Sequence, residues 1–287
     1  MATNILVTGA TGTTGQPIAE LLSRMQGVAV RAATRSPGKV AQDGKTAYVP
    51  FDYEEVSSIQ KALEGVQKVY LVTPFVPEMF DYESRVIAQL KNAGVQHVVK
   101  LSVIGADPEN GITPQQIHGQ LEQLIRETGI PYTFLRPGSF MQNYAHYMSQ
   151  TIKAQQAFYQ PLGEGKLSLV DARDIAAVAR EALTGGGHEG QAYTLTGPEA
   201  LSNYEVAAIL SDVLGREIKY VDVPEQQARQ GMEAAGMPEW FIARMEELNR
   251  AGKAGYMATI SQDIEKVTGA RPTSFRQFAA DYADAFR

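Results

Sequence analysis

The sequence predicts an α/β protein with a doubly wound parallel sheet, followed by a smaller lobe of mixed α/β structure. Two observations predict this class. Apolar, strand-like runs alternate with segments of helical periodicity through the first half of the chain, and a glycine-rich loop follows the first of these strands at once. Strands that alternate with helices are typical of parallel sheets covered by helices on both faces.

Strand-like runs are predicted at residues 5–8, 28–34, 47–51, 69–73, 97–102 and 132–136. Helical periodicity separates several of them, at residues 16–25, 56–63, 80–93 and 117–127. Gly94 and Gly129 each follow a predicted helix and precede a new strand. Glycine often closes a helix because it adopts the left-handed conformation without strain. We therefore assign residues 1–138 to the core of the fold.

The alternation loosens after residue 138. The predicted elements there are a helix at 144–155, a hairpin of strands 158–162 and 167–170, a helix at 175–183 capped by Asp174, and strands at 192–196 and 218–223. Ser202 and Glu205 form a capping box for a helix that ends at Gly215. Residues 139–287 are expected to be mainly a substrate-binding lobe, with some segments returning to the core.

The loop at residues 9–15 has the spacing G-x-x-G-x-x-G between a strand and a helix. Its glycines allow a tight turn, close approach of a diphosphate to the backbone, and close packing of helix on strand. The helix N-terminus adds N–H groups and a partial positive charge where the anion would bind. The loop thus predicts a Rossmann-type dinucleotide site formed by Gly9, Thr11, Gly12, Thr13, Thr14 and Gly15.

The segment after the second strand indicates which dinucleotide is bound. An acidic residue there would accept the ribose 2′-hydroxyl of NAD, whereas a basic residue would meet the 2′-phosphate of NADP. Residues 33–39 contain no carboxylate, and Arg35 and Lys39 can bracket a phosphate. We expect NADPH rather than NADH. The adenine is expected near Asp52 and Tyr53, and the path to the nicotinamide near Thr73, Pro74 and Phe75.

Four segments together resemble the NmrA-like, atypical short-chain dehydrogenase/reductase family. They are TGATGTTG at 8–15, SVIGA at 102–106, GIPYTFLRPG at 129–138 and TLTGP at 194–198. The resemblance covers essentially the whole chain. It implies a Rossmann core and an NADP(H) site, in a family that includes NADPH-dependent quinone and triphenylmethane reductases besides nitrogen-regulatory redox sensors.

The sequence departs from typical short-chain dehydrogenases at the catalytic centre. Those enzymes use a Tyr-x-x-x-Lys pair, and no tyrosine in this chain has a lysine four residues later. The resemblance places the lysine slot of isoflavone-reductase-like proteins on His118 and the tyrosine slot on Pro114. His118 would then hold the nicotinamide ribose or donate a proton, since its unperturbed pKa is near 6.5. Ser102, at the end of the fifth strand, matches the usual catalytic serine and would orient a carbonyl, or simply ends the strand.

Aromatic and polar side chains after the sixth strand predict a pocket for a flat, conjugated molecule. The candidates, several of which also suit core packing, are Phe140, Met141, Asn143, Tyr144 and Tyr147. We expect an NADPH-dependent oxidoreductase that transfers hydride to a quinone-like acceptor, because such an acceptor takes its proton from solvent and needs no tyrosine acid. The alternative is a redox-sensing regulatory protein that binds NADP(H) with little catalysis.

Composition excludes several other classes. The chain of 287 residues has no cysteine, so thiolate nucleophiles and cysteine-ligated metals are excluded, and its histidines show no metal-ligand spacing. The formal net charge of −6 does not favour nucleic-acid binding. No run is apolar enough for a membrane span, and the N-terminus has no signal-peptide pattern. We expect a cytoplasmic monomer or homodimer.

Overall fold

The computed structural model describes residues 2–39 and 46–287, and only the backbone of Lys39. The chain divides into two compact units. Unit 1 comprises Met1–Gly111, Gln115–Arg136 and Ala172–Thr194, and unit 2 comprises Ile112–Pro114, Pro137–Asp171 and Leu195–Arg287. Unit 1 therefore takes in a segment well beyond residue 138, the end of the core expected from the sequence.

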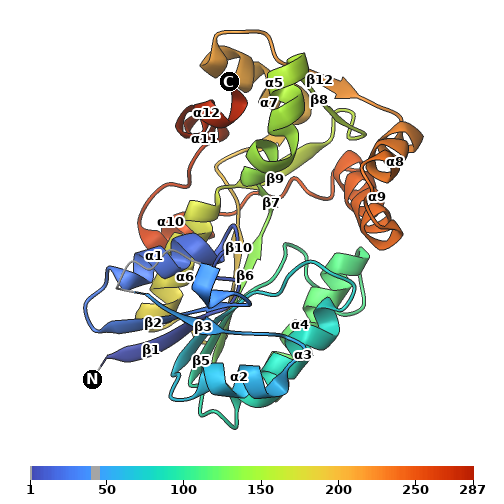
Figure 1. Ribbon diagram of the computed structural model, residues 1–287. Coiled ribbons are helices and arrows are strands. Elements are labelled where there is room, and N and C mark those ends of the chain that lie inside the picture. The colour runs from blue at the N-terminus through green and yellow to red at the C-terminus, as the bar shows by residue number, and fades with distance from the viewer. Residues whose placement is uncertain (1, 40–45) are drawn as a thin grey trace. The chain divides into compact units, whose positions relative to one another are not determined.

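Unit 1 is built on a seven-stranded sheet in the order β10-β6-β5-β4-β1-β2-β3 (Figure 1). The strands are β1 (Thr3–Val7), β2 (Val28–Thr34), β3 (Ala47–Pro50), β4 (Lys68–Leu71), β5 (His97–Leu101), β6 (Tyr132–Pro137) and β10 (Gln191–Leu195). The pairings from β3 through β6 are parallel. The chain builds outward from β1 to β3 and then returns to place β4 on the other side of β1. This reversal creates a switch point between β1 and β4, where open α/β sheets bind ligands at their carboxyl edge.

Helices cover both faces of this sheet, which confirms the doubly wound Rossmann-type fold. The helices α1 (Gly15–Ser23) and α6 (Ala172–Thr184) pack together on one face, and α2 (Val56–Leu63), α3 (Met79–Leu90) and α4 (Thr113–Glu127) lie along the other (Figure 1). A short 3-10 helix, η1 (Pro37–Lys39), follows β2.

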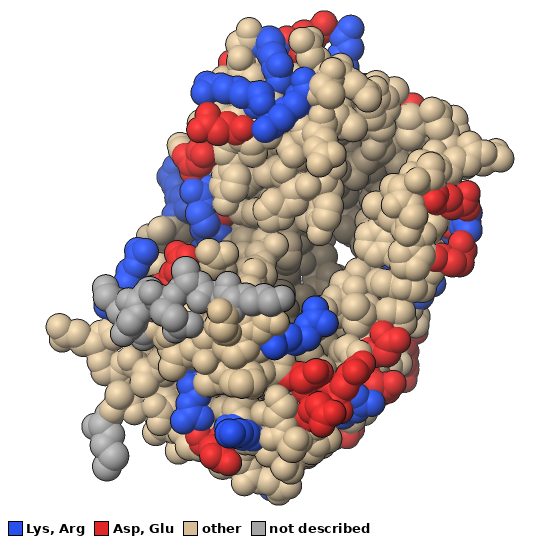
Figure 2. Space-filling model, viewed as in Figure 1, with Lys and Arg blue, Asp and Glu red and all other residues tan. Residues whose placement is uncertain are grey.

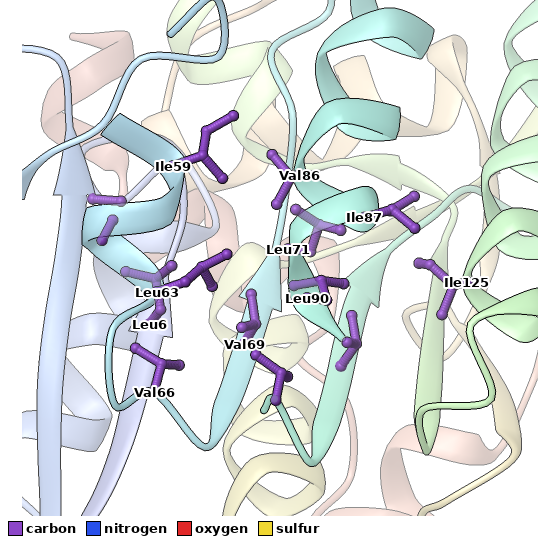
Figure 3. Close-up of a cluster of buried hydrophobic side chains, with 14 of the residues drawn as sticks. Leu6, Ile59, Leu63, Val66, Val69, Leu71, Val86, Ile87, Leu90 and Ile125 are labelled. Carbon is purple, nitrogen blue, oxygen red and sulfur yellow. The ribbon is translucent and has the colours of Figure 1, made fainter. Parts of the chain in front are cut away.

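The apolar faces of α2, α3 and α4 bury against the sheet (Figure 3). Ile59 and Leu63 of α2, and Val86 and Leu90 of α3, are four residues apart and fully buried. This spacing places each pair on one helix face. The strands contribute buried residues from their inward-facing positions, among them Leu6, Val69 and Leu71. Burial of each such side chain contributes about 1.5–3 kcal/mol, so this face is a main source of the stability of unit 1.

Unit 2 contains two small sheets. One has the order β11 (Ala200–Ser202), β9 (Lys166–Val170), β7 (Ser139–Phe140), and the other pairs β12 (Lys219–Asp222) with β8 (Ala157–Gln160). The helical segments are η2 (Tyr144–Met148), α5 (Ser149–Gln155), α7 (Asn203–Leu214), α8 (Glu225–Ala234), α9 (Glu239–Lys253), α10 (Asp263–Thr268), α11 (Phe275–Asp281) and α12 (Ala283–Phe286).

The hairpin predicted from strands 158–162 and 167–170 is wrong. β8 pairs in parallel with β12, whereas β9 pairs with β11 and β7. The turn between them forms as expected, with the Gly165 N–H donating to the Leu162 carbonyl at 2.9 Å. Each of the two strands pairs instead with strands that are distant in the sequence, and no local sequence pattern predicts such pairings.

The helix ends follow the local signals in part. Ser202 and Glu205 form the predicted capping box, and α7 closes at Gly215, whose φ is 65°. Asp174 does not cap α6, because the helix begins at Ala172 and leaves Asp174 in its first turn. A carboxylate at this place still interacts favourably with the helix dipole. The predicted helix 144–155 consists of a π-helical turn, η2, followed by α5.

None of the helices in the described ranges combines the length and the apolar character that crossing a bilayer requires. On the face of the molecule seen in Figure 2, basic and acidic side chains are interspersed.

Candidate active site

The glycine loop lies at the switch point of the sheet. Thr8, fully buried after β1, ties the loop to the end of β4: its hydroxyl donates to the Val72 carbonyl at 2.8 Å and accepts from the Val72 N–H at 2.7 Å. The loop then turns into α1, with the Gly12 N–H donating to the Gly9 carbonyl at 2.8 Å. The sequence brings strand, glycine turn and helix N-terminus together as the motif requires.

Two glycines of the loop, Gly9 and Gly15, leave no room for a side chain, and Gly12 lies at the open side of the turn. Gly9 has a φ of +58°, and a Cβ there would lie 2.7 Å from Val72 Cγ1. A Cβ on Gly15 would overlap the backbone of Gly9 and Ala10. Gly12 and Thr11 are exposed, and a Cβ on Gly12 would meet only the Gly9 carbonyl, at 3.2 Å. The backbone is therefore open to a diphosphate at this turn, and the loop fits a dinucleotide.

Arg35 directly follows the last residue of β2, next to the carboxyl edge of the sheet. Its side chain is exposed and makes no ion pair or side-chain hydrogen bond with the described residues. The guanidinium is thus available to a phosphate as a two-pronged donor. The Lys39 side chain lies outside the described part of the chain.

The two residues expected near the adenine form the turn that leads into α2. Asp52 Oδ1 accepts from the Glu54 N–H at 2.9 Å. The Tyr53 hydroxyl donates to the Val72 carbonyl at 2.6 Å, and its ring stacks on Tyr82 with centroids 5.7 Å apart. Tyr53 thereby contacts the same end of β4 as Thr8 does.

The segment after β4 presents one buried and two exposed residues. Thr73 is buried, and its hydroxyl donates to Glu83 Oε2 of α3 at 2.8 Å. Pro74 is exposed, and Phe75 has 41% of its surface exposed. Phe75 therefore lies partly exposed after β4, at the carboxyl edge of the sheet.

A buried ion pair adjoins His118. Lys100, in the middle of β5, places its Nζ 2.5 Å from Glu83 Oε1, and both side chains are 0% exposed. The same Nζ lies 3.3 Å from Nδ1 of His118, a half-buried residue of α4. Burial lowers the pKa of His118 well below its ordinary value, and the Lys100 charge lowers it further. Both effects favour the neutral imidazole over the ordinary pKa near 6.5 on which the expected proton donation by His118 depended.

Ser102 belongs to a second buried polar group. Its hydroxyl donates to Glu122 Oε1 at 2.6 Å, and the same carboxylate accepts two hydrogen bonds from Arg136, at 2.9 and 2.5 Å. Ser102 and Glu122 are 4% and 0% exposed. A hydroxyl has one hydrogen to donate. Because this hydrogen is given to Glu122, Ser102 cannot donate it to a substrate carbonyl in this arrangement, which was one of the two roles expected from the sequence. The hydrogen bond joins the end of β5 to α4.

The five candidate pocket residues of unit 2 fall into two groups. Met141 and Tyr144 are 1% and 2% exposed and belong to the hydrophobic core of that unit, where the Tyr144 hydroxyl donates to Asn203 Oδ1 at 2.7 Å. The structure thus gives these two residues a packing role. Phe140 and Asn143 are partly exposed, and Tyr147 is 76% exposed.

Sequence reasoning missed Lys100, Glu83 and Glu122. One signal was available for Lys100, a charged residue within the apolar run that forms β5, since lysine is almost never fully buried unless it is paired. Within the described ranges, no group of three or more histidine and carboxylate side chains is arranged to hold a metal ion.

Known proteins with the same architecture include enzymes solved with nicotinamide cofactors. Triphenylmethane reductase of Citrobacter sp., complexed with NADP(H), superposes with a TM-score of 0.86 at 27% identity, covering 97% of this chain and 99% of that one. The NADPH-dependent quinone oxidoreductase QOR2 of Escherichia coli, complexed with NADPH, gives a TM-score of 0.87 at 25% identity, covering 99% and 100%.

Sequence comparison extends this similarity. NAD(P)H azoreductase of Xenophilus azovorans is 42% identical over 285 residues, which cover 98% of this chain and 99% of the relative. The model of the NmrA-like family matches residues 1–279, nearly the whole chain. The resemblance seen in the four sequence segments is thereby confirmed, and the chain belongs to the NmrA-like family.

Proposed function

We propose that this protein is an NADPH-dependent reductase that transfers hydride to a quinone-like or otherwise conjugated small molecule. Its broader class, an NAD(P)H-dependent oxidoreductase, follows from its family and from full-length similarity to reductases. The observation that carries the proposal is the glycine loop at residues 9–15, open at the switch point of the sheet and followed by the N-terminus of α1.

Several residues would hold the cofactor. The loop glycines and the N-terminus of α1 would bind the diphosphate, and Arg35 would pair with a 2′-phosphate. The complexes of triphenylmethane reductase with NADP(H) and of QOR2 with NADPH support this choice of nucleotide. Asp52 and Tyr53 would lie toward the adenine, and Thr73, Pro74 and Phe75 toward the nicotinamide. Bound NADPH would supply a hydride, which is one proton with two electrons.

The acceptor takes the hydride on an electron-poor carbon, and its π electrons move onto an oxygen or nitrogen, which becomes an anion. A proton from water then neutralises that atom, so the reaction balances without a tyrosine acid. The partly or fully exposed residues Phe140, Asn143 and Tyr147 are our candidates for contacting the conjugated ring. Because burial and the Lys100 charge lower the pKa of His118, this residue would contribute a hydrogen bond rather than a charge.

A steady-state assay with NADPH and a panel of quinones, azo dyes, triphenylmethane dyes and enones tests the proposal. We expect saturable NADPH consumption with one or more of these acceptors. Equimolar binding of NADP+ and NADPH with no consumption across the panel would contradict it. That outcome would instead identify the redox-sensing alternative.

A further inference from the structure

The buried Lys100 side chain determines how His118 can carry its hydrogen. An ammonium group has three hydrogens to donate and accepts none. Lys100 Nζ lies 2.5 Å from Glu83 Oε1, 3.3 Å from the Leu101 carbonyl and 3.3 Å from Nδ1 of His118. The contact with Glu83 is an ion pair, whereas the Leu101 carbonyl and Nδ1 of His118 accept hydrogen bonds from the ammonium. Nδ1 of His118 therefore carries a lone pair.

We propose that Lys100 is a positioning residue that holds His118 as the neutral tautomer with its hydrogen on Nε2, which His118 donates to the atom of the acceptor that becomes negative. This inference rests on the proposed function and deepens it. Nε2 of His118 has no hydrogen-bond partner among the described residues, and the residue is partly exposed. The hydrogen is therefore available to a ligand.

The ion pair is built to keep Lys100 in place. Thr73 donates to Oε2 of Glu83, and Oε1 lies in ion-pair contact with Lys100 without hydrogen-bond geometry. The resulting chain runs from Thr73 at the end of β4, through Glu83 of α3 and Lys100 of β5, to His118 of α4. The opposite charge of Glu83 at 2.5 Å holds the buried ammonium in place. Residues from four parts of unit 1 thus form one series of contacts that ends at Nδ1 of His118.

The chemistry suits a reaction that creates negative charge. A neutral N–H aimed at an oxygen that gains charge stabilises the transition state more than the ground state. A second positive charge next to the Lys100 ammonium is unfavourable, and burial also opposes it, so the imidazole keeps this neutral form. Because the hydrogen is already on Nε2, no shift from Nδ1 to Nε2 is needed before His118 can donate to the acceptor.

Nitrogen NMR of the full chain with ¹⁵N-labelled histidine reads the tautomer directly, because protonated and bare ring nitrogens resonate far apart. The chain has four histidines, and His118→Gln assigns the signal. We expect His118 to be protonated on Nε2 alone and to remain neutral from pH 8 to pH 6. An Nδ1–H signal, or titration near pH 6.5, would overturn the proposal.

Two variants test the part played by Lys100. Lys100→Met alone leaves the Glu83 carboxylate buried and unpaired and risks unfolding. The double variant Lys100→Met/Glu83→Leu removes both charges and keeps similar volumes. In this variant we expect His118 to populate both tautomers, and kcat to fall about tenfold with the KM for NADPH unchanged. Circular dichroism and NADPH titration serve as controls for folding and cofactor binding.

The outcomes separate the two claims. An unchanged tautomer or an unchanged kcat in the double variant would overturn the role of Lys100. If the wild-type protein turns over no acceptor at all, the proposed function fails and with it the catalytic use of Nε2. The NMR spectra would still show whether Lys100 sets the tautomer.

Discussion

Ser102 donates its hydroxyl hydrogen to Glu122 across 2.6 Å, and both side chains are buried. Ser102 follows β5 and Glu122 belongs to α4, so the bond ties a strand end to the helix that also carries His118. Arg136 of β6 completes the group by binding both oxygens of Glu122. Three elements of unit 1 are thereby held together beside the candidate site.

Because its hydrogen is given to Glu122, Ser102 is expected to matter more for stability than for turnover. Ser102→Ala should lower the free energy of unfolding by about 1–3 kcal/mol, since the carboxylate loses a buried donor. The kcat should change less than threefold. Urea denaturation and the steady-state assay measure the two effects. A large loss of kcat with unchanged stability would show instead that the hydroxyl contacts the acceptor.

Gly15 should tolerate no side chain. Gly15→Ala places a Cβ against the Gly9 carbonyl and should destabilise the protein by about 1–3 kcal/mol while abolishing NADPH binding. The control is Gly186→Ala, where a Cβ has nothing within 4 Å. Thermal unfolding and NADPH fluorescence titration compare the two variants. Equal behaviour would show that the close approach of helix and loop is unimportant.

Arg35→Ala should weaken NADPH binding about 10- to 100-fold and leave NADH binding nearly unchanged, because only NADPH carries the 2′-phosphate. Arg24→Ala is the matched control, because Arg24 is also exposed but lies at the C-terminal end of α1, opposite to the end that follows the glycine loop. Parallel fluorescence titrations measure all four affinities. A similar loss for both nucleotides would remove the argument that Arg35 selects NADPH.

His97 should make the protein sensitive to acid. Its pKa is lowered to about 4, first by burial and then by the Lys68 charge. The Thr133 hydroxyl donates to the His188 carbonyl, so it accepts from His97 Nε2 and leaves Nδ1 bare and without a partner among the described residues. Protonation would bury an unpaired N–H.

The sign of this effect follows from the lowered pKa. Between about pH 6.5 and pH 4 the unfolded state binds a proton at His97 and the folded state does not, so stability is full above this range and falls as the pH drops through it. The Tm of His97→Gln should therefore decline less between pH 6.5 and pH 5 than that of the wild type. Equal slopes in thermal unfolding scans would contradict the prediction.

Variants of Tyr144 and Tyr147 should distinguish a tyrosine that packs in the core of unit 2 from one that is exposed to a ligand. Tyr144→Phe removes the donor to Asn203 in the core of unit 2 and should cost about 1–3 kcal/mol of stability. Tyr147→Phe, at a side chain that is 76% exposed, should change stability by less than about 0.5 kcal/mol. If Tyr147 contacts the acceptor, its replacement by Ala raises the KM of the acceptor but not that of NADPH. Urea denaturation and steady-state kinetics check each effect.

Local sequence determined the architecture of unit 1 and its dinucleotide loop. The spacing of Gly9, Gly12 and Gly15 was informative because neighbouring residues leave no room for a Cβ at Gly9 and Gly15, and Gly12 keeps the turn open. The spacing of apolar residues in the strands and helices was also informative, because each element buries one face and apolar residues recur along that face. Ser202 and Glu205 lie within one turn of each other, so their capping box was also visible in the sequence.

Tertiary structure decided what local sequence leaves open. The pairing of β8 with β12 joins segments about sixty residues apart, and no nearby pattern specifies it. The surroundings of His118 on α4 depend on Lys100 of β5, which contacts its ring, and on Glu83 of α3, which pairs with Lys100. The sequence alone thus determined the cofactor loop, whose contacts are local. Only the fold decided the lowered pKa of His118 and the hydrogen bond of Ser102, because burial and charge come from residues that are distant in the chain.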